Sequence, residues 1–178
     1  MKLHIGCGKK YLPGYKHLDI IDYDHVDYVC DAKRLKMIDD ETVSEIYACH
    51  ILEHFKRNEV LEVLKEWHRV LVPNGLIRIS VPDFEAIVAE YLVNGDLNRL
   101  QGLLFGGQTY DYNFHHVAFD FTSLKSLLNE AGFYEIKKYD WKNFLPEGYD
   151  DYSRAYLPHM DFENGRLMSL NLQAKKRK

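Results

Sequence analysis

Two glycines and two carboxylates near the N-terminus have the types and order of a nucleoside-binding site. Gly6 and Gly8 end the first apolar run, where glycine permits a tight turn and lets a ligand lie on the backbone amides. Asp19 follows the second apolar run, with Asp22 as an alternative, and Asp31 follows the third. The first carboxylate can accept both hydrogen bonds of a ribose diol, and the second can accept from the exocyclic amine of adenine.

The same stretch lacks the signatures of phosphate binding. The third glycine of the dinucleotide fingerprint G-x-G-x-x-G would stand at Tyr11, and the chain has no GK[ST] motif. The site therefore suits a nucleoside that carries an amino-acid tail rather than a pyrophosphate.

Apolar runs bounded by turn residues predict the strands that position these groups. Strands are expected at 3–5, 17–21, 27–30, 44–49, 76–81, 134–141 and 167–174. Apolar residues at helical spacing predict helices at 58–71, 84–92, 97–104 and 122–131. This alternation indicates an α/β fold with a Rossmann-like open sheet, mostly parallel, with an antiparallel final strand and helices on both faces. Ligands of such sheets bind beyond the carboxyl ends of the strands.

The whole chain, residues 1–178, is expected to form a single domain with two long loops. Residues 105–121 are rich in glycine, histidine and aromatic residues. Residues 142–165 form an excursion between the last two strands, too long for a hairpin turn. This excursion is interpreted either as a lid over an acceptor site or as a packed loop held by an Arg–Asp pair.

The ordered motifs of the chain resemble the class I S-adenosylmethionine-dependent methyltransferases, in the branch of small methyltransferase domains. The motifs are LHIGCG, PGYKHLDI, DA, ILEHF, VLVPNGLIRISVPD and EAGF, and they extend over residues 3–133. The resemblance implies S-adenosyl-L-methionine as the cofactor. The contacts it implies are Gly6, Cys7 and Gly8 for the methionine part, Asp19 for the ribose, Asp31 and Ala32 for the adenine, and Cys49 and His50 for the sulfonium.

Two features depart from the family pattern. Only residues 9–16 separate Gly8 from the second strand, whereas a parallel crossover normally has about 10–12 residues or more. The first helix is therefore expected to shrink to a turn, which leaves that edge of the pocket open or covered by another segment. His4 stands where the family commonly has an acid, so no carboxylate is expected there to order the glycine loop.

Histidines are the candidates for catalysis. A sulfonium methyl is transferred by in-line displacement, so a hydroxyl acceptor needs a base to take its proton, and histidine suits neutral pH. His116 is expected as the base, because the resemblance places its loop, YDYNFHHVAFDF, against the substrate; His54 is the second candidate. His115, Tyr112 and Arg154 are expected to contact the acceptor. The loop's aromatic residues either belong to the core or stack on a sugar or planar acceptor.

The expected function is methyl transfer from S-adenosylmethionine to a hydroxyl, or less readily an amine, of a small molecule or glycan. An aminopropyl transferase and a non-catalytic cofactor-binding module that acts through a partner remain alternatives. No metal is expected, because the His and Asp residues of the excursion lack metal-ligand spacing.

The composition of the chain limits the remaining classes of partner and location. The net charge of −4 argues against a nucleic-acid partner, and no apolar stretch approaches the ~18 residues of a membrane span. The three cysteines show no CxxC spacing and suit a reducing compartment. The glycine at position 6 leaves no room for a signal peptide, so the expected location is the cytoplasm. The oligomeric state is left open.

Overall fold

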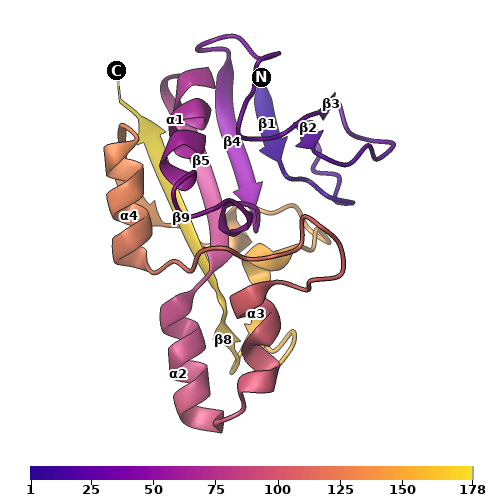
Figure 1. Cartoon of the computed structure of the whole chain (residues 1–178), viewed down its shortest axis with the longest axis vertical. Helices are drawn as coiled ribbons and strands as arrows, with labels where there is room; N and C mark the ends of the chain where they lie inside the picture. Colours follow the sequence, from indigo (N-terminus) through magenta and orange to yellow (C-terminus); the bar gives the residue numbers. More distant parts are fainter. Residues whose placement is uncertain (178) are drawn as a thin grey trace.

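A seven-stranded sheet forms the centre of the protein. A computed structural model describes residues 1–177, and its sheet has the order β3-β2-β1-β4-β5-β9-β6 (Figure 1). The strands are β1 (Lys2–Ile5), β2 (Lys16–Asp19), β3 (Tyr28–Val29), β4 (Val43–Cys49), β5 (Leu71–Pro82), β6 (Phe133–Lys138) and β9 (Ser169–Lys176). Strands β1 to β5 pair in parallel, and β9 runs antiparallel to β5 and β6. The predicted Rossmann-like α/β fold with an antiparallel final strand is confirmed.

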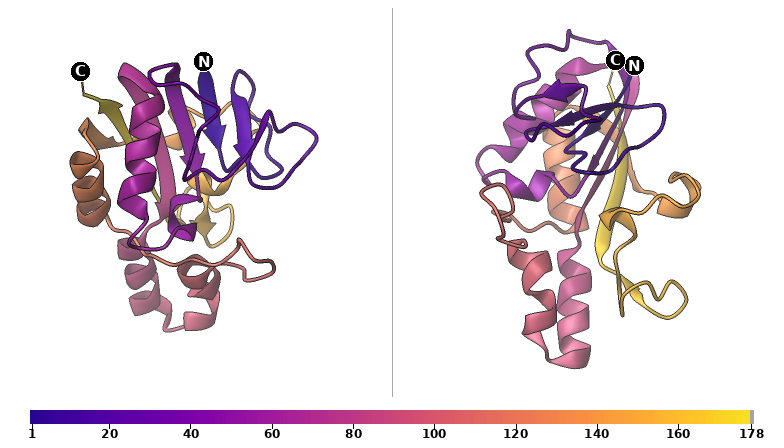
Figure 2. Two further views of the ribbon diagram at one scale, coloured as in Figure 1. Left: turned by 45° about the horizontal axis from the view of Figure 1, so that its top comes forward. Right: turned by 90° about the vertical axis from the view of Figure 1, so that its right-hand side faces the viewer.

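The two faces of the sheet have different covers. Helices α1 (Val60–Val70) and α4 (Phe121–Glu130) lie side by side on one face (Figure 2). The other face is covered by the excursion, whose short helical turns η3 (Trp141–Asn143) and η4 (Tyr152–Arg154) lie across it. The remaining elements are η1 (Leu52–His54), α2 (Phe84–Asn94), η2 (Leu97–Leu100), α3 (Gln101–Phe105), and a hairpin of β7 (Tyr156–Leu157) and β8 (Arg166–Leu167).

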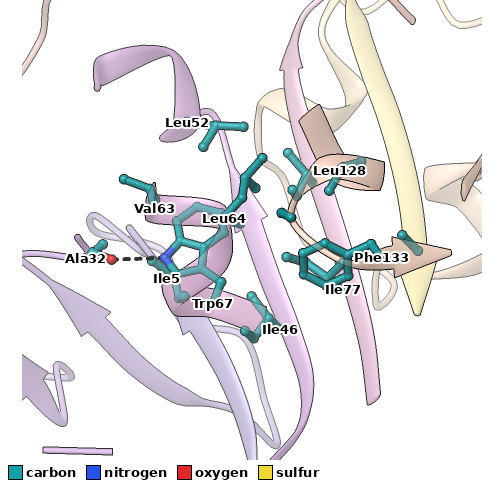
Figure 3. Close-up of a cluster of buried hydrophobic side chains, with 14 of the residues drawn as sticks. Ile5, Ala32, Ile46, Leu52, Val63, Leu64, Trp67, Ile77, Leu128 and Phe133 are labelled. Atoms are coloured by element: carbon teal, nitrogen blue, oxygen red, sulfur yellow. Dashed lines mark hydrogen bonds between the residues drawn. The ribbon is translucent and has the colours of Figure 1, made fainter. Parts of the chain in front are cut away.

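Helix α1 is the main hydrophobic contact of the sheet (Figure 3). Its buried residues recur at helical spacing and form one stripe: Val60, Val63, Leu64, Trp67 and Val70. The Trp67 indole N–H donates a hydrogen bond to the Ala32 carbonyl oxygen, 2.9 Å away. This bond ties the loop after β3 to the helix, which fixes one wall of the crevice described below.

The strand order reverses between β1 and β4. The chain runs outward from β1 to β2 and β3, and then returns to add β4 and β5 on the other side. At such a reversal the connections leave the sheet in opposite directions, and a crevice opens at the carboxyl ends of the strands. The glycine loop after β1 and the turn after β4 meet at this point.

The first crossover, residues 6–15, contains turns and no helix, as expected from its length. Its own side chains cover the adjoining sheet face. Leu12 is fully buried, and its backbone N–H donates to Nε2 of His17 at 2.9 Å. The Tyr11 ring stacks on the His17 ring with centroids 4.8 Å apart. The sheet is therefore closed here without the usual helix.

Several element boundaries differ from the sequence expectation. Strand β5 begins at Leu71 and includes the Pro73-Asn74-Gly75 turn that was expected to precede it. The β4–β5 register shifts here and absorbs the extra residues, with Asn74 at φ +61°. Among residues 1–177, no helix is both long and apolar enough to cross a membrane.

Candidate active site

A cavity of about 300 Å³ lies at the carboxyl ends of β1 to β4, at the low end of the range for small-molecule sites. It combines the glycine loop, the ends of β2 and β3, the turn after β4, and the loop between α3 and α4, which crosses this edge of the sheet (Figure 1). Its lining includes the following sequence-predicted residues: Gly6, Gly8, Asp19, Asp31, Ala32, His50, His54, Tyr112 and His116.

The glycine loop after β1 needs glycine for two different reasons. Gly6 has φ +66°, and a Cβ there would collide with the side chain of Ile51. Gly8 has φ +53°, and a Cβ there would meet open space. The loop therefore packs closely against the turn after β4 at Gly6 and presents bare backbone to the cavity at Gly8.

Asp19 holds the glycine loop and lies at the floor of the cavity. Its Oδ2 accepts a hydrogen bond from the Gly8 N–H at 2.7 Å, and its Oδ1 accepts one from the Ile21 N–H at 2.9 Å. A carboxylate offers about four lone-pair sites, so both oxygens can accept a further bond from a diol. Asp22, the alternative acid, does not line the cavity.

Asp31 and Ala32 form the wall after β3. Asp31 Oδ1 accepts from the Lys33 N–H at 2.9 Å, and its side chain is 44% exposed. The Lys33 ammonium lies 3.5 Å from Asp31 and 3.4 Å from Glu59, so it joins this wall to the start of α1. The Asp31 carboxylate is thus held at the rim with acceptor capacity to spare.

The turn after β4 brings His50 to the sheet edge. His50 has φ +50°, an uncommon conformation for a residue with a side chain. Ser169 Oγ donates to the Tyr152 carbonyl oxygen at 2.7 Å, so His50 Nε2, 2.5 Å from the same Oγ, donates its N–H to it. The ring is therefore oriented by Ser169 at the start of β9, and its Nδ1 lies 3.3 Å from Glu53 Oε1.

In the aromatic-rich loop of residues 105–121, some aromatic side chains line the cavity and others belong to the core. Tyr110, Tyr112 and Phe114 line the cavity and are 51%, 55% and 38% exposed, and His116 lines it with them. Phe119 is buried in the main core. The two interpretations of these aromatic residues therefore apply to different members of the loop.

Glu53 is a buried acid behind the cavity, surrounded by histidines. Burial by itself raises the pKa of Glu53, but the neighbouring His50, whose Nδ1 lies 3.3 Å away, together with His54 and His115, lowers it below its usual value. Burial lowers the pKa of His115, although the nearby Glu53 acts in the opposite direction. Glu53 is therefore an anion, and His115 is neutral at pH 7.

Four sequence-predicted residues lie outside the cavity lining. The Cys7 thiol faces His25 Nε2 at 3.7 Å, and burial raises its pKa to about 12. Burial also raises the pKa of Cys49, whose neighbours include Asp151 on the excursion side of the sheet. His115 lies behind the cavity against Glu53.

Arg154 stabilises the excursion. Its guanidinium lies between the rings of Trp141 and Phe162, 4.8 and 4.7 Å from their centroids, and pairs with Asp150 at 3.7 Å. The excursion packs on the sheet through a 2.6 Å bond from the Tyr47 hydroxyl to Asp151. None of residues 142–165, all of which the structure describes, lines the cavity.

Sequence reasoning missed part of the lining. Tyr23 follows β2 by only a few residues, and Ile51 and Phe55 are the first and last residues of the ILEHF motif. Their nearness to predicted strand ends was a usable signal. No sequence signal marked Lys56 and Glu59, because their place in the cavity lining depends on where α1 starts.

The residues present fit an adenosyl cofactor with an amino-acid tail. The backbone at Gly8 is bare, and Asp19 and Asp31 line the same cavity from two neighbouring strand ends. The fold and this site define a Rossmann-like domain of the methyltransferase type.

The chain matches the family described as methyltransferase domain over residues 17–79. This match and the shared fold confirm the resemblance to class I S-adenosylmethionine-dependent methyltransferases, and S-adenosylmethionine is the cofactor that they indicate. No curated protein matches the chain significantly.

Solved structures share the fold at low identity. A methyltransferase from Thermotoga maritima, described as a possible histamine N-methyltransferase, has a TM-score of 0.61 at 17% identity, covering 99% of this chain and 81% of its own. The Burkholderia thailandensis 1,6-didemethyltoxoflavin-N1-methyltransferase, with bound S-adenosylhomocysteine, has a TM-score of 0.56 at 16% identity, with 92% and 61% covered. A possible exported protein from Bordetella parapertussis has a TM-score of 0.56 at 15% identity, and the chain covers 93% of itself but 55% of that protein.

Proposed function

We propose that this protein transfers the methyl group of S-adenosylmethionine to a hydroxyl of a small molecule or glycan, with His116 as the general base. One observation carries the proposal. The cavity that contains Gly8, Asp19 and Asp31 continues to a wall that carries Tyr112 and His116. A cofactor site and a histidine suited to proton transfer thus share one space.

The protein's part in the reaction is positioning and proton removal. When bound, S-adenosylmethionine supplies a methyl group already activated on sulfonium, and its transfer to an acceptor oxygen leaves S-adenosylhomocysteine and a proton. His116 accepts this proton, and its exposed ring passes the proton on to water. His54, whose Nδ1–H donates to the Phe114 carbonyl oxygen at 3.1 Å, is the second candidate base.

The residues of this cavity wall indicate which class of acceptor the site would bind. Tyr110, Tyr112 and Phe114 offer exposed rings that support stacking on a sugar or a planar molecule, and Asp111 adds a carboxylate that can accept from hydroxyls. The net charge of −4 disfavours a nucleic-acid acceptor. Two proteins of similar fold are described as N-methyltransferases, so an amine is the alternative acceptor.

The test is a turnover assay on sugars, nucleotide sugars, phenols and amines, with mass-spectrometric detection of a methyl group in place of a hydrogen. We expect O-methylated products from the wild-type protein. His116→Gln should lower kcat by about 10²–10⁴-fold and leave the affinity for S-adenosylhomocysteine unchanged.

His159→Gln is the matched control, because His159 is exposed and lies outside the cavity lining. It should retain wild-type turnover. Products methylated only on nitrogen would contradict the hydroxyl assignment, and full activity of His116→Gln would contradict the base.

A further inference from the structure

Glu53 is a buried carboxylate whose charge no hydrogen bond balances. It lies in η1 with its side chain 1% exposed, and neither of its oxygens accepts a hydrogen bond from any residue in 1–177. A buried carboxylate without hydrogen bonds is costly, so such groups are usually paired or coordinate a metal ion.

Two histidines lie beside this carboxylate, and in each of them a backbone carbonyl oxygen meets the same ring nitrogen. His54 donates its Nδ1–H to the Phe114 carbonyl oxygen at 3.1 Å, and His115 donates its Nδ1–H to the Leu103 carbonyl oxygen at 3.0 Å. Because a carbonyl oxygen only accepts, both protons must lie on Nδ1. In its neutral form each ring keeps a lone pair on Nε2, and a backbone carbonyl fixes its orientation, as is typical of metal-binding histidines.

We propose that Glu53, His54 and His115 bind a divalent transition-metal ion at the edge of the cavity. One ligand atom from each residue lies within 4.8 Å of the others, and the two imidazole rings meet at 4.7 Å. Metal–ligand distances of about 2.0–2.2 Å require ligand atoms roughly 3.3 Å apart, so the site closes when the ligand atoms approach one another by up to about 1.5 Å.

The fold, not the sequence spacing, assembles this triad. Glu53 and His54 are adjacent on η1, whereas His115 comes from the loop after α3. The His116 N–H donates to the Glu53 carbonyl oxygen at 2.8 Å and holds that loop against η1. This proposal replaces the sequence-based expectation of no metal, which considered only the excursion and local spacing.

The ligand chemistry selects the class of ion. Two imidazoles and one carboxylate suit Zn²⁺, Fe²⁺ or Co²⁺, whereas Mg²⁺ and Ca²⁺ prefer oxygen ligands. Three protein ligands leave at least one coordination position open. Because His54 also lines the cavity, that position is available to an acceptor oxygen, and the ion would lower its pKa. This role, unlike metal binding itself, rests on the proposed function, and it makes His54 a ligand and leaves His116 as the base.

The competing explanation is an ion pair. His50 Nδ1 lies 3.3 Å from Glu53 Oε1, and an imidazolium there would balance the carboxylate without a metal. The two explanations differ in whether the protein binds metal stoichiometrically and in whether His115 is required.

The test is a titration of the chelator-treated 178-residue chain with Co²⁺, followed by visible d–d absorption. Wild-type protein should bind one ion per chain with a low-symmetry spectrum. His115→Asn and Glu53→Gln should weaken binding on the order of 100-fold or more. His116→Asn is the matched control, one residue along the same loop, and should bind as the wild type does.

The outcomes separate this inference from the proposed function. No stoichiometric Co²⁺ binding, or equal binding by wild type and a folded His115→Asn, would overturn the metal site and favour the ion pair. S-adenosylhomocysteine affinity is measured on the same samples by calorimetry. Cofactor binding without metal binding would contradict only the metal site. Metal binding without cofactor binding would contradict only the proposed function.

Discussion

At the scale of single residues, the two carboxylates of the cavity differ in how much of their bonding the protein already uses. Asp19 is 8% exposed, and both of its oxygens accept backbone hydrogen bonds. Asp31 has one backbone bond and a 44% exposed side chain. Removing Asp19 therefore disturbs the loop as well as the ligand site, whereas removing Asp31 tests the ligand site more cleanly.

Asp31→Ala should weaken S-adenosylhomocysteine binding about tenfold or more, because it removes a charged hydrogen-bond acceptor from the adenine end. The thermal midpoint of the cofactor-free protein should stay near the wild-type value. Calorimetric titration measures the affinity. Asp22→Ala, a substitution outside the cavity lining, should bind normally, and equal losses in both variants would show that general charge rather than position matters.

The glycines and carboxylates could be predicted because each follows an apolar run, and parallel strands bring their carboxyl ends to one edge. The cluster of Glu53, His54 and His115 could not be predicted, because the path of a long loop brings His115 to Glu53. For the same reason, Cys7 and Cys49 were assigned to the cofactor by motif position, although neither lines the cavity.

At the scale of elements, the missing first helix leaves an unusual sheet face under the crossover. The rings of His4, His17 and Tyr47 pack together there, with His4 centroids 5.6 and 5.2 Å from the other two. His4 is 2% exposed, and its Nδ1 has no hydrogen-bond partner among the described residues. Burial, with the nearby His17 and His25, lowers the pKa of His4 to about 3.

This buried ring predicts a loss of stability in acid. The unfolded chain takes up a proton at His4 near pH 6.5, but the folded protein does so only near pH 3. The free energy of unfolding should therefore fall as the pH drops from about 6.5 to 3, by up to about 1.4 kcal/mol per pH unit for this proton. Above pH 6.5 the group has no effect.

His4→Phe should keep the ring packing and remove this proton. Urea unfolding between pH 4 and 7 measures how the free energy of unfolding changes with pH. This free energy should fall less steeply toward acid in the variant than in the wild type. Some slope should remain, because burial also lowers the pKa of His17. Identical slopes for the two proteins would mean that His4 is protonated in the folded state.

Element types could be predicted from periodicity, but element ends could not. The α1 stripe and the short apolar strands have clear patterns, and the structure contains each of them. The turn inside β5 was expected to end a helix, because its Pro-Asn-Gly sequence does not reveal that a β-bulge can absorb it. The excursion's 3₁₀ turns are held by tertiary contacts, such as Arg154 between two rings, that no local pattern signals.

At the scale of the whole molecule, the position of the site follows from the strand order. The chain reverses between β1 and β4, and the cavity lies where the connections diverge. Helices cover one face of the sheet and the excursion covers the other (Figure 2). The cavity lies at the carboxyl-end edge of the strands. The proposed function requires one cofactor to lie across that edge, from the glycine loop after β1 to the end of β3.

A crystal structure of the protein with S-adenosylhomocysteine tests this claim most directly. We expect the ribose hydroxyls on Asp19, the adenine beside Asp31 and Ala32, and the homocysteine tail on the backbone at Gly8. Density for the ligand at any other place, or a ligand in this cavity that touches neither carboxylate, would contradict it.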